Sequence, residues 1–358
     1  KNLRRVIDNS IILSVIAGVF LTIIGIAFAP QLLRLMNTPD DVLDLAVTYL
    51  RIYFSGVTVM LVYNVGAGLI RAGGDSRRPL YYLIVSGLLN LVLDILFVAS
   101  FDMGVAGAAW ATVISQACSA VLVVIHMMRF PKEYRLSVRS IRYDKITAMK
   151  IIKLAVPCGV QSAMFNIANL LVQIKINSFG SVAMAGVAAY TKIDGFVYTP
   201  TQAISLAVST YVGQNIGARM LDRVERGFNA TMKMGGVSTI VLAAIVIAFA
   251  TPVLQMFNIS GDALIRGREH LYILMVCSIF NCISSVSSGL LQGAGDVKPP
   301  AVAGFVNLLV RVGSAYLMAG TFVDFRCIYV SIPFSWGAMC AINYFRYRSG
   351  KWKRYNIV

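Results

Sequence analysis

Charged residues are scarce in this sequence of 358 residues, at 13% of the total, whereas hydrophobic residues make up 58%. The mean hydropathy is +0.73, far from that of an ordinary soluble domain. Ten apolar segments are long enough to cross a hydrocarbon core of about 30 Å. They are residues 10–29, 45–69, 80–100, 104–128, 150–176, 182–212, 234–257, 269–291, 300–320 and 326–345. Strand periodicity is absent, so we predict an all-α polytopic membrane protein.

Groups that carry out catalysis or bind metals are also few. The chain has two histidines, His126 and His270, and they are isolated from each other. Its six cysteines form no C-x-x-C pair, and the sequence shows no H-E-x-x-H motif and no Ser/His/Asp set. We therefore expect no enzyme activity, no cofactor and no redox role for the cysteines.

Acidic residues are half as numerous as basic ones, with 16 Asp and Glu against 32 Lys and Arg. Most of the basic residues fall in alternate connections between apolar segments, which is the positive-inside pattern. The main clusters are three residues in 1–5, three in 71–78, eight in 129–153, four in 219–233 and five in 346–354. The net charge of +16 therefore indicates topology and not a nucleic-acid partner. We predict a bacterial plasma-membrane protein with both chain ends in the cytoplasm.

One turn motif occurs twice in the sequence. The stretch GLIRAGGDSRRP, residues 68–79, returns as GLLQGAGDVKPP, residues 289–300, at an offset of 221 residues. Gly and Asp tolerate the backbone angles of a tight turn, and Pro begins the next segment. A repeat of this size in a helical membrane protein is typical of two bundles related by a pseudo-two-fold axis along the membrane normal.

The repeat also predicts the domain organisation. We expect an N-terminal lobe at 1–130, a basic inter-lobe loop at 131–149, a C-terminal lobe at 150–346 and a basic cytoplasmic tail at 347–358. Residues 150–221 have no counterpart in the first copy. We therefore expect a sequence that lacks the first two of twelve helices, so that ten are present.

Several motifs resemble those of the multidrug and toxic compound extrusion (MATE) transporters. Besides the two turns, they are NLVLD at 90–94, GVAGAAWATVISQ at 104–116 and GQNIGA at 213–218, in family order across nearly the whole chain. The resemblance implies two six-helix lobes facing a central cavity, alternating access, and export driven by Na⁺ or H⁺.

Asp94 is the most informative residue, because a carboxylate inside a membrane costs roughly 2.5–3.5 kcal/mol on insertion scales. In a helical hairpin with its turn near Met103, Thr112 is expected level with Asp94, and Asn90 lies one turn away on the same helix face. A carboxylate, an amide oxygen and a hydroxyl are suitable ligands for Na⁺, and the acid could instead carry a proton. The residues alone leave open a hydrogen-bonded helix contact that binds no ion.

The resemblance places Asn90, Asp94 and Thr112 on positions that the family uses for cation coupling. The family's partner acid lies on its first helix, which this chain lacks. In the second copy the corresponding residues are Arg311, Ala315 and Pro333, so the second lobe repeats the fold without these side chains. We therefore predict the coupling site in the first lobe.

The second lobe carries its own polar residues. They are Gln161, Asn166, Asn169, Lys192, Asp194 and Arg311. They could contact substrate, or they could form interhelical hydrogen bonds and a charge pair beside a wet cavity. Some family members carry an acid eight residues after the proline of the seventh helix, but Phe165 occupies that position after Pro157 here. A second-lobe cation site is therefore not expected.

We predict a cation-coupled secondary exporter of small organic compounds, cationic or amphipathic, that functions as a monomer among membrane lipids. The alternative is a flippase for lipid-linked sugar precursors, from a related superfamily. A flippase should need a large basic cavity for a pyrophosphate, and few basic residues lie in the apolar segments.

Overall fold

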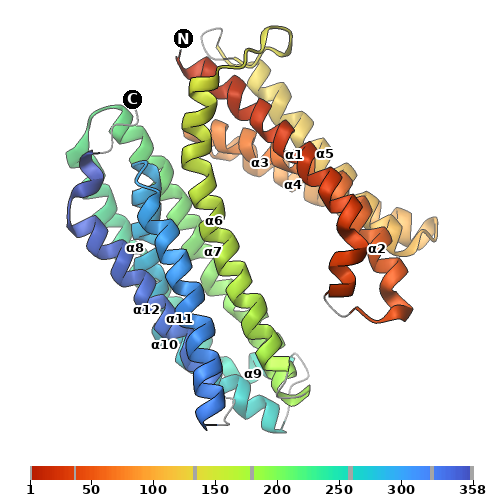
Figure 1. Cartoon of the computed structure of the whole chain (residues 1–358), viewed down its shortest axis with the longest axis vertical. Helices are drawn as coiled ribbons and strands as arrows, with labels where there is room; N and C mark the ends of the chain where they lie inside the picture. The colour runs from red at the N-terminus through yellow and green to blue at the C-terminus, as the bar shows by residue number, and fades with distance from the viewer. Residues whose placement is uncertain are drawn as a thin grey trace. The chain divides into compact units, whose positions relative to one another are not determined.

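The computed structural model describes residues 2–35, 38–131, 135–177, 181–256, 261–322 and 326–354, and within these ranges its regular secondary structure is helical, without strands. The α-helices, labelled in Figure 1, are α1 (Asn2–Leu35), α2 (Asp40–Ser55), α3 (Val57–Ala72), α4 (Arg77–Asp94), α5 (Gly104–Met128), α6 (Lys145–Asn177), α7 (Ser181–Gly217), α8 (Leu221–Ala248), α9 (Ala250–Met256), α10 (Gly261–Gly293), α11 (Lys298–Phe322) and α12 (Arg326–Arg348). Short helical turns are η1 (Ile95–Ser100), η2 (Val138–Ser140) and η3 (Lys351–Arg354). The predicted all-α fold is confirmed.

The helices have the length and composition of membrane spans. Among the described residues, seven helices are long and apolar enough to cross a bilayer, and the bent pair α2–α3 would make an eighth span. Each of the ten predicted segments falls on helices, although residue 257 at the end of one segment lies outside the described residues. The protein is an integral membrane protein.

The chain divides into two compact units, residues 1–152 and 153–358, with the boundary inside α6. The helices of the two units follow the 221-residue repeat seen in the sequence. This shift carries the ends of the α2–α3 pair, Asp40 and Ala72, onto Gly261 and Gly293, the ends of α10. It also carries the first residue of α4 onto that of α11. The two units therefore repeat one arrangement of helices.

The units differ at Gly56. Here α2 and α3 are bent by 44°, whereas α10 continues unbroken through the corresponding position. A Cβ atom on Gly56 would lie 2.7 Å from Cγ2 of Val113, on α5. At this bend the backbone therefore approaches α5 so closely that a larger residue would clash with Val113.

The repeated turn adopts the same backbone in both units, because Gly74 and Gly295 have φ of 96° and 79°. The aspartate that follows is used differently. Asp75 Oδ1 accepts the backbone N–H groups of Arg77 and Arg78, each at 3.1 Å, and so satisfies the start of α4. Asp296 is 1% exposed, and its Oδ2 lies 2.6 Å from Nε of Arg346 on α12.

We expect alanine at these two aspartates to have unequal effects on stability. Asp296→Ala should cost about 3–5 kcal/mol, because it removes the buried carboxylate that pairs with the Arg346 guanidinium. Asp75→Ala removes a helix cap and an exposed ion pair, and should cost about 1 kcal/mol. Unfolding of the purified protein in detergent, followed by circular dichroism, measures both. Equal losses would contradict the distinction.

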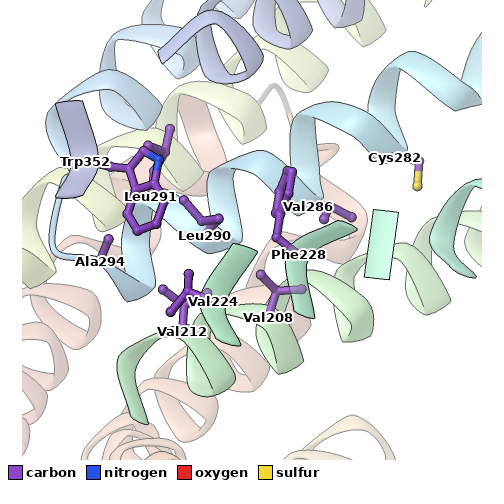
Figure 2. Close-up of a cluster of buried hydrophobic side chains, with 10 residues drawn as sticks. All are labelled: Val208, Val212, Val224, Phe228, Cys282, Val286, Leu290, Leu291, Ala294 and Trp352. Carbon is purple, nitrogen blue, oxygen red and sulfur yellow. The ribbon is translucent and has the colours of Figure 1, made fainter. Parts of the chain in front are cut away.

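The end of the second unit folds back onto its own core. Gly350, with φ of 66°, reverses the chain after α12, and Trp352 is 1% exposed. Figure 2 shows the indole among side chains from α7, α8 and α10, including Val212 and Leu291. Its Nε1 donates to the carbonyl oxygen of Tyr347 at 3.2 Å, and Lys353 forms an ion pair with Glu225 on α8. The predicted tail therefore packs on the bundle through Trp352 and Lys353.

Trp352→Ala should destabilise the protein by about 3–5 kcal/mol, because it empties a buried indole site. Phe345→Ala is the matched control, since that ring is 70% exposed near the end of α12, and should change stability by less than about 0.5 kcal/mol. Thermal unfolding in detergent, monitored by circular dichroism, compares the two variants. A similar effect of both would show that the indole does not hold η3 in place.

Candidate functional site

The backbone changes from α-helical to π-helical geometry at Asp94. The α-helical part of α4 ends at this residue, and η1 continues the same span as a π-helix. π-helical turns are rare and occur frequently at functional sites, because the extra residue per turn reorients the side chains next to it. This turn could not be predicted from the sequence, since hydropathy does not distinguish α from π geometry.

Two polar atoms near this turn are unsatisfied. Oδ1 of Asp94 and Nδ2 of Asn90 are both buried, and neither has a hydrogen-bond partner in the described part of the chain. The two residues lie one helical turn apart, so their side chains share a face of α4. An isolated buried carboxylate oxygen is costly in a membrane, so it marks a place where a cation or a proton could bind.

Thr112, the third predicted residue, lies on the neighbouring helix α5. Its hydroxyl donates to the carbonyl of Ala108 at 3.0 Å, which leaves the oxygen free to accept or to bind a cation. Two close contacts give the register of α4 and η1 against α5. Ser86 Oγ donates to the carbonyl of Ser115 at 2.6 Å, and a Cβ on Gly107 would lie 3.0 Å from Cβ of Phe97.

The prediction that Thr112 and Asp94 are level assumed an α-helical hairpin on both sides of Met103, and the π-helical geometry of η1 departs from that assumption. The three residues could still contribute a carboxylate, an amide oxygen and a hydroxyl to one Na⁺, or the carboxylate could carry a proton alone. No group of three or more His, Cys, Asp or Glu residues suited to a metal is found where the structure is described.

Asp94→Asn should leave the protein as stable as the wild type, or more stable by about 1 kcal/mol, because it removes a buried charge whose Oδ1 accepts no hydrogen bond. Asp102→Asn is the control, since Asp102 is exposed at the end of the same span and asparagine tolerates its φ of 51°. Melting temperatures in detergent compare the two variants. A marked loss in Asp94→Asn alone would indicate a structural role for the carboxylate.

The second unit contains a polar cavity of about 480 Å³. Three of the predicted residues, Gln161, Asn166 and Asn169, line it from α6. The sequence prediction included none of the other lining residues. These are Ser162, Phe165, Tyr198, Gln202, Ser205, Asn281, Ser284, Ser285, Ser288, Gln292 and Met339.

Hydrogen bonds connect the cavity wall across helices. Nε2 of Gln292, on α10, donates to Oε1 of Gln161 at 2.9 Å and lies 3.3 Å from Oγ of Ser288. Ser205 Oγ, on α7, donates to the carbonyl of Ser285 at 2.6 Å. The wall is therefore built from neutral donors and acceptors, and all of its lining residues are uncharged.

The predicted charged residues lie outside this lining. Arg311, on α11, is 8% exposed, and its guanidinium carbon lies 5.9 Å from the centre of the Phe165 ring. Phe165 in turn stacks on Tyr198, with the ring centres 6.1 Å apart. Asp194 lies one turn before Tyr198 on α7. The side chain of Lys192 lies outside the described residues.

A sequence signal for the cavity did exist. The polar positions of α10, from Asn281 to Gln292, follow a helical spacing of three and four residues in an otherwise apolar span. Such a stripe on a membrane helix faces protein or water, not lipid. Serine-rich stripes also occur where helices pack closely without a cavity. The stripe on α10 therefore could not be assigned to a cavity from the sequence alone.

A membrane-spanning repeat with polar side chains inside its helices is the architecture of a secondary transporter. The family model MatE matches residues 1–96 and 157–317 of the chain. The chain belongs to the MATE family of transporters.

Relatives and solved structures agree with this assignment. The chain is 26% identical over 369 residues to "Probable multidrug resistance protein YoeA" of Bacillus subtilis, an alignment that covers 100% of this chain and 79% of the relative. It is 23% identical over 368 residues to "Probable multidrug resistance protein NorM" of Thermotoga maritima, covering 99% and 77%. A solved structure described as the outward-facing conformation of a multidrug resistance MATE family transporter of the MOP superfamily superposes with a TM-score of 0.89 at 22% identity, covering 98% of this chain and 80% of that one.

Proposed function

We propose that the protein is a secondary active exporter of small organic compounds, cationic or amphipathic, that exchanges them for H⁺ or Na⁺ by alternating access in the plasma membrane. The observation that carries this proposal is the buried Oδ1 of Asp94, which has no hydrogen-bond partner in the described part of the chain. A membrane carboxylate without a structural partner suits a group that loads and releases a cation. Family membership and the relatives' names, which refer to multidrug resistance, support the export of organic compounds.

In the proposed cycle, cation binding at Asp94 and substrate binding favour different conformations. A cation can shift the equilibrium only by its differential affinity for the two states. Binding of H⁺ or Na⁺ neutralises Asp94 and removes the cost of an isolated charge in the span. In the cation-bound protein, the surroundings of Asp94 can therefore exclude water. Asn90 and Thr112 would supply further oxygen ligands if the cation is Na⁺.

The polar cavity of the second unit is the proposed place for substrate contact. Amide and hydroxyl groups beside the stacked rings of Phe165 and Tyr198 suit an organic compound that has both polar and apolar parts. A lipid-linked pyrophosphate, the substrate of the alternative flippase, would require cations in the wall. The uncharged lining therefore favours export of organic compounds over lipid-linked sugar transport.

The test is efflux of a fluorescent organic cation from proteoliposomes that contain the full-length protein, under an imposed Na⁺ or pH gradient. Wild type should show efflux that depends on one of the two gradients, and that gradient identifies the ion. Asp94→Asn should lower this efflux about tenfold or more, as expected when the coupling between ion and substrate is lost. Asp102→Asn removes the same charge at an exposed site and should leave efflux unchanged.

Efflux by Asp94→Asn at the wild-type rate, with the same dependence on the gradient, would refute the role of Asp94. Absence of wild-type efflux under both gradients, combined with movement of a fluorescent lipid-linked pyrophosphate analogue across the bilayer, would favour the flippase.

A further inference from the structure

A basic pocket of about 800 Å³ lies at the start of α1, where the loop that precedes α6 folds against it. Its lining includes Arg4, Arg5, Ser140, Arg142 and Tyr143, together with two aspartates. Figure 1 shows the beginnings of α1 and α6 at the same end of the first unit. The volume falls within the range of about 300–1,000 Å³ that is usual for small-ligand sites.

The pocket is a built structure, because Asn9 fixes the loop to α1. Asn9 is fully buried, and its Oδ1 accepts the backbone N–H of Asp144 at 2.9 Å. Its Nδ2 donates to the carbonyl of Arg5 at 2.8 Å, and the Arg4 guanidinium donates to the hydroxyl of Ser140. The positions of the arginines relative to the loop are therefore set by hydrogen bonds between segments far apart in sequence.

Both aspartates contact other groups through Oδ2, whereas Oδ1 of Asp8 is buried without a hydrogen-bond partner in the described part of the chain. Asp8 is 3% exposed, and its Oδ2 lies 3.4 Å from the backbone N of Arg142 and 4.0 Å from Nε of Arg4. Asp144 caps α6, since its Oδ2 accepts the backbone N–H of Thr147 at 3.1 Å as well as the Thr147 hydroxyl. The hydroxyl and backbone donors of Thr147 hold the pKa of Asp144 below its usual range. Asp144 therefore stays ionised as a helix cap.

Two arginines remain available to a ligand. The side chains of Arg5 and Arg142 are in exposed residues, and neither donates a hydrogen bond or forms a close ion pair in the described part of the chain. A guanidinium group binds phosphate oxygens through two parallel N–H groups, which makes arginine well suited to a phosphodiester.

The pocket is at the level where the membrane surface should lie. The candidate spans in α1 and α6 begin at Leu3 and Lys145, directly beside it. Tyr143 is 60% exposed at this boundary, as expected for an interfacial aromatic residue. Along α6 from the pocket, Ile146 and Met149 are 71% and 45% exposed and offer an apolar path for an acyl chain.

We propose that this pocket binds the headgroup phosphate of an anionic phospholipid, with Arg5 and Arg142 as its ligands and the acyl chains along Ile146 and Met149. Basic pockets at the ends of spanning helices on the cytoplasmic side are suited to such headgroups. A free phosphate ion would use the same arginines but would gain nothing from the apolar residues. This site is separate from Asp94 and from the cavity of the second unit.

The experiment measures lipid binding to the full-length protein in detergent by native mass spectrometry, with phosphatidylglycerol as the probe and phosphatidylcholine as the reference. The double variant Arg5→Gln/Arg142→Gln should weaken phosphatidylglycerol binding roughly tenfold or more and leave phosphatidylcholine binding unchanged. The control is Arg223→Gln/Arg226→Gln, which removes two exposed charges at the start of α8, where Arg226 is the repeat counterpart of Arg5. It should bind phosphatidylglycerol like the wild type.

Equal weakening in both double variants would show general charge attraction and overturn the proposal, as would unchanged binding in Arg5→Gln/Arg142→Gln. Competition by inorganic phosphate at the concentration of the lipid would identify a phosphate-ion site and would also overturn it. Melting temperatures show whether either variant is unfolded. A second variant, Ile146→Gln/Met149→Gln, keeps the arginines and should weaken phosphatidylglycerol binding but not binding of inorganic phosphate.

Discussion

A bilayer core contains no water, so each polar group within a span needs a partner from the chain itself. The backbone meets this requirement by forming helices, and the tight turns with positive φ fall between the spans. Many side-chain hydroxyls find a partner within their own helix, because they donate to a backbone carbonyl three or four residues earlier. Thr112 donates to Ala108 and Ser278 donates to Met275 in this way. Against this background, a polar side-chain atom without a partner is informative.

The repeat allows the two units to be compared position by position. In the first unit Ser86 donates to the carbonyl of Ser115 and joins α4 to α5. In the second unit the corresponding residues are Asn307 and Trp336, and their side-chain nitrogen and oxygen atoms have no partner among the described residues. The same backbone arrangement therefore carries different polar contacts, so the two units cannot be assumed to do the same work in transport.

The helices and the repeat could be predicted from the sequence because both depend on local information. The length of an apolar segment predicts a membrane span, and Gly and Asp residues predict a tight turn. The bend at Gly56, the π-helical turn after Asp94 and the burial of Trp352 depend on which side of a helix meets another helix. Hydropathy does not report this, since lipid is as apolar as a protein core. The same limit explains the cavity: Gln161 and Asn166 were predicted to line it, whereas the serines of α10 were not.

The position of Asp94 shows why the argument for a cation site does not depend on family resemblance alone. Its counterpart in the second unit is Ala315, which is fully buried, so this place in the fold accepts a methyl group without loss of the helix. A carboxylate there costs roughly 2.5–3.5 kcal/mol on insertion scales, and Oδ1 recovers none of it through a hydrogen bond in the described part of the chain. An acid in one unit only fits the proposed site for H⁺ or Na⁺, in which its charge would be compensated in one state of the cycle and exposed to water in the other.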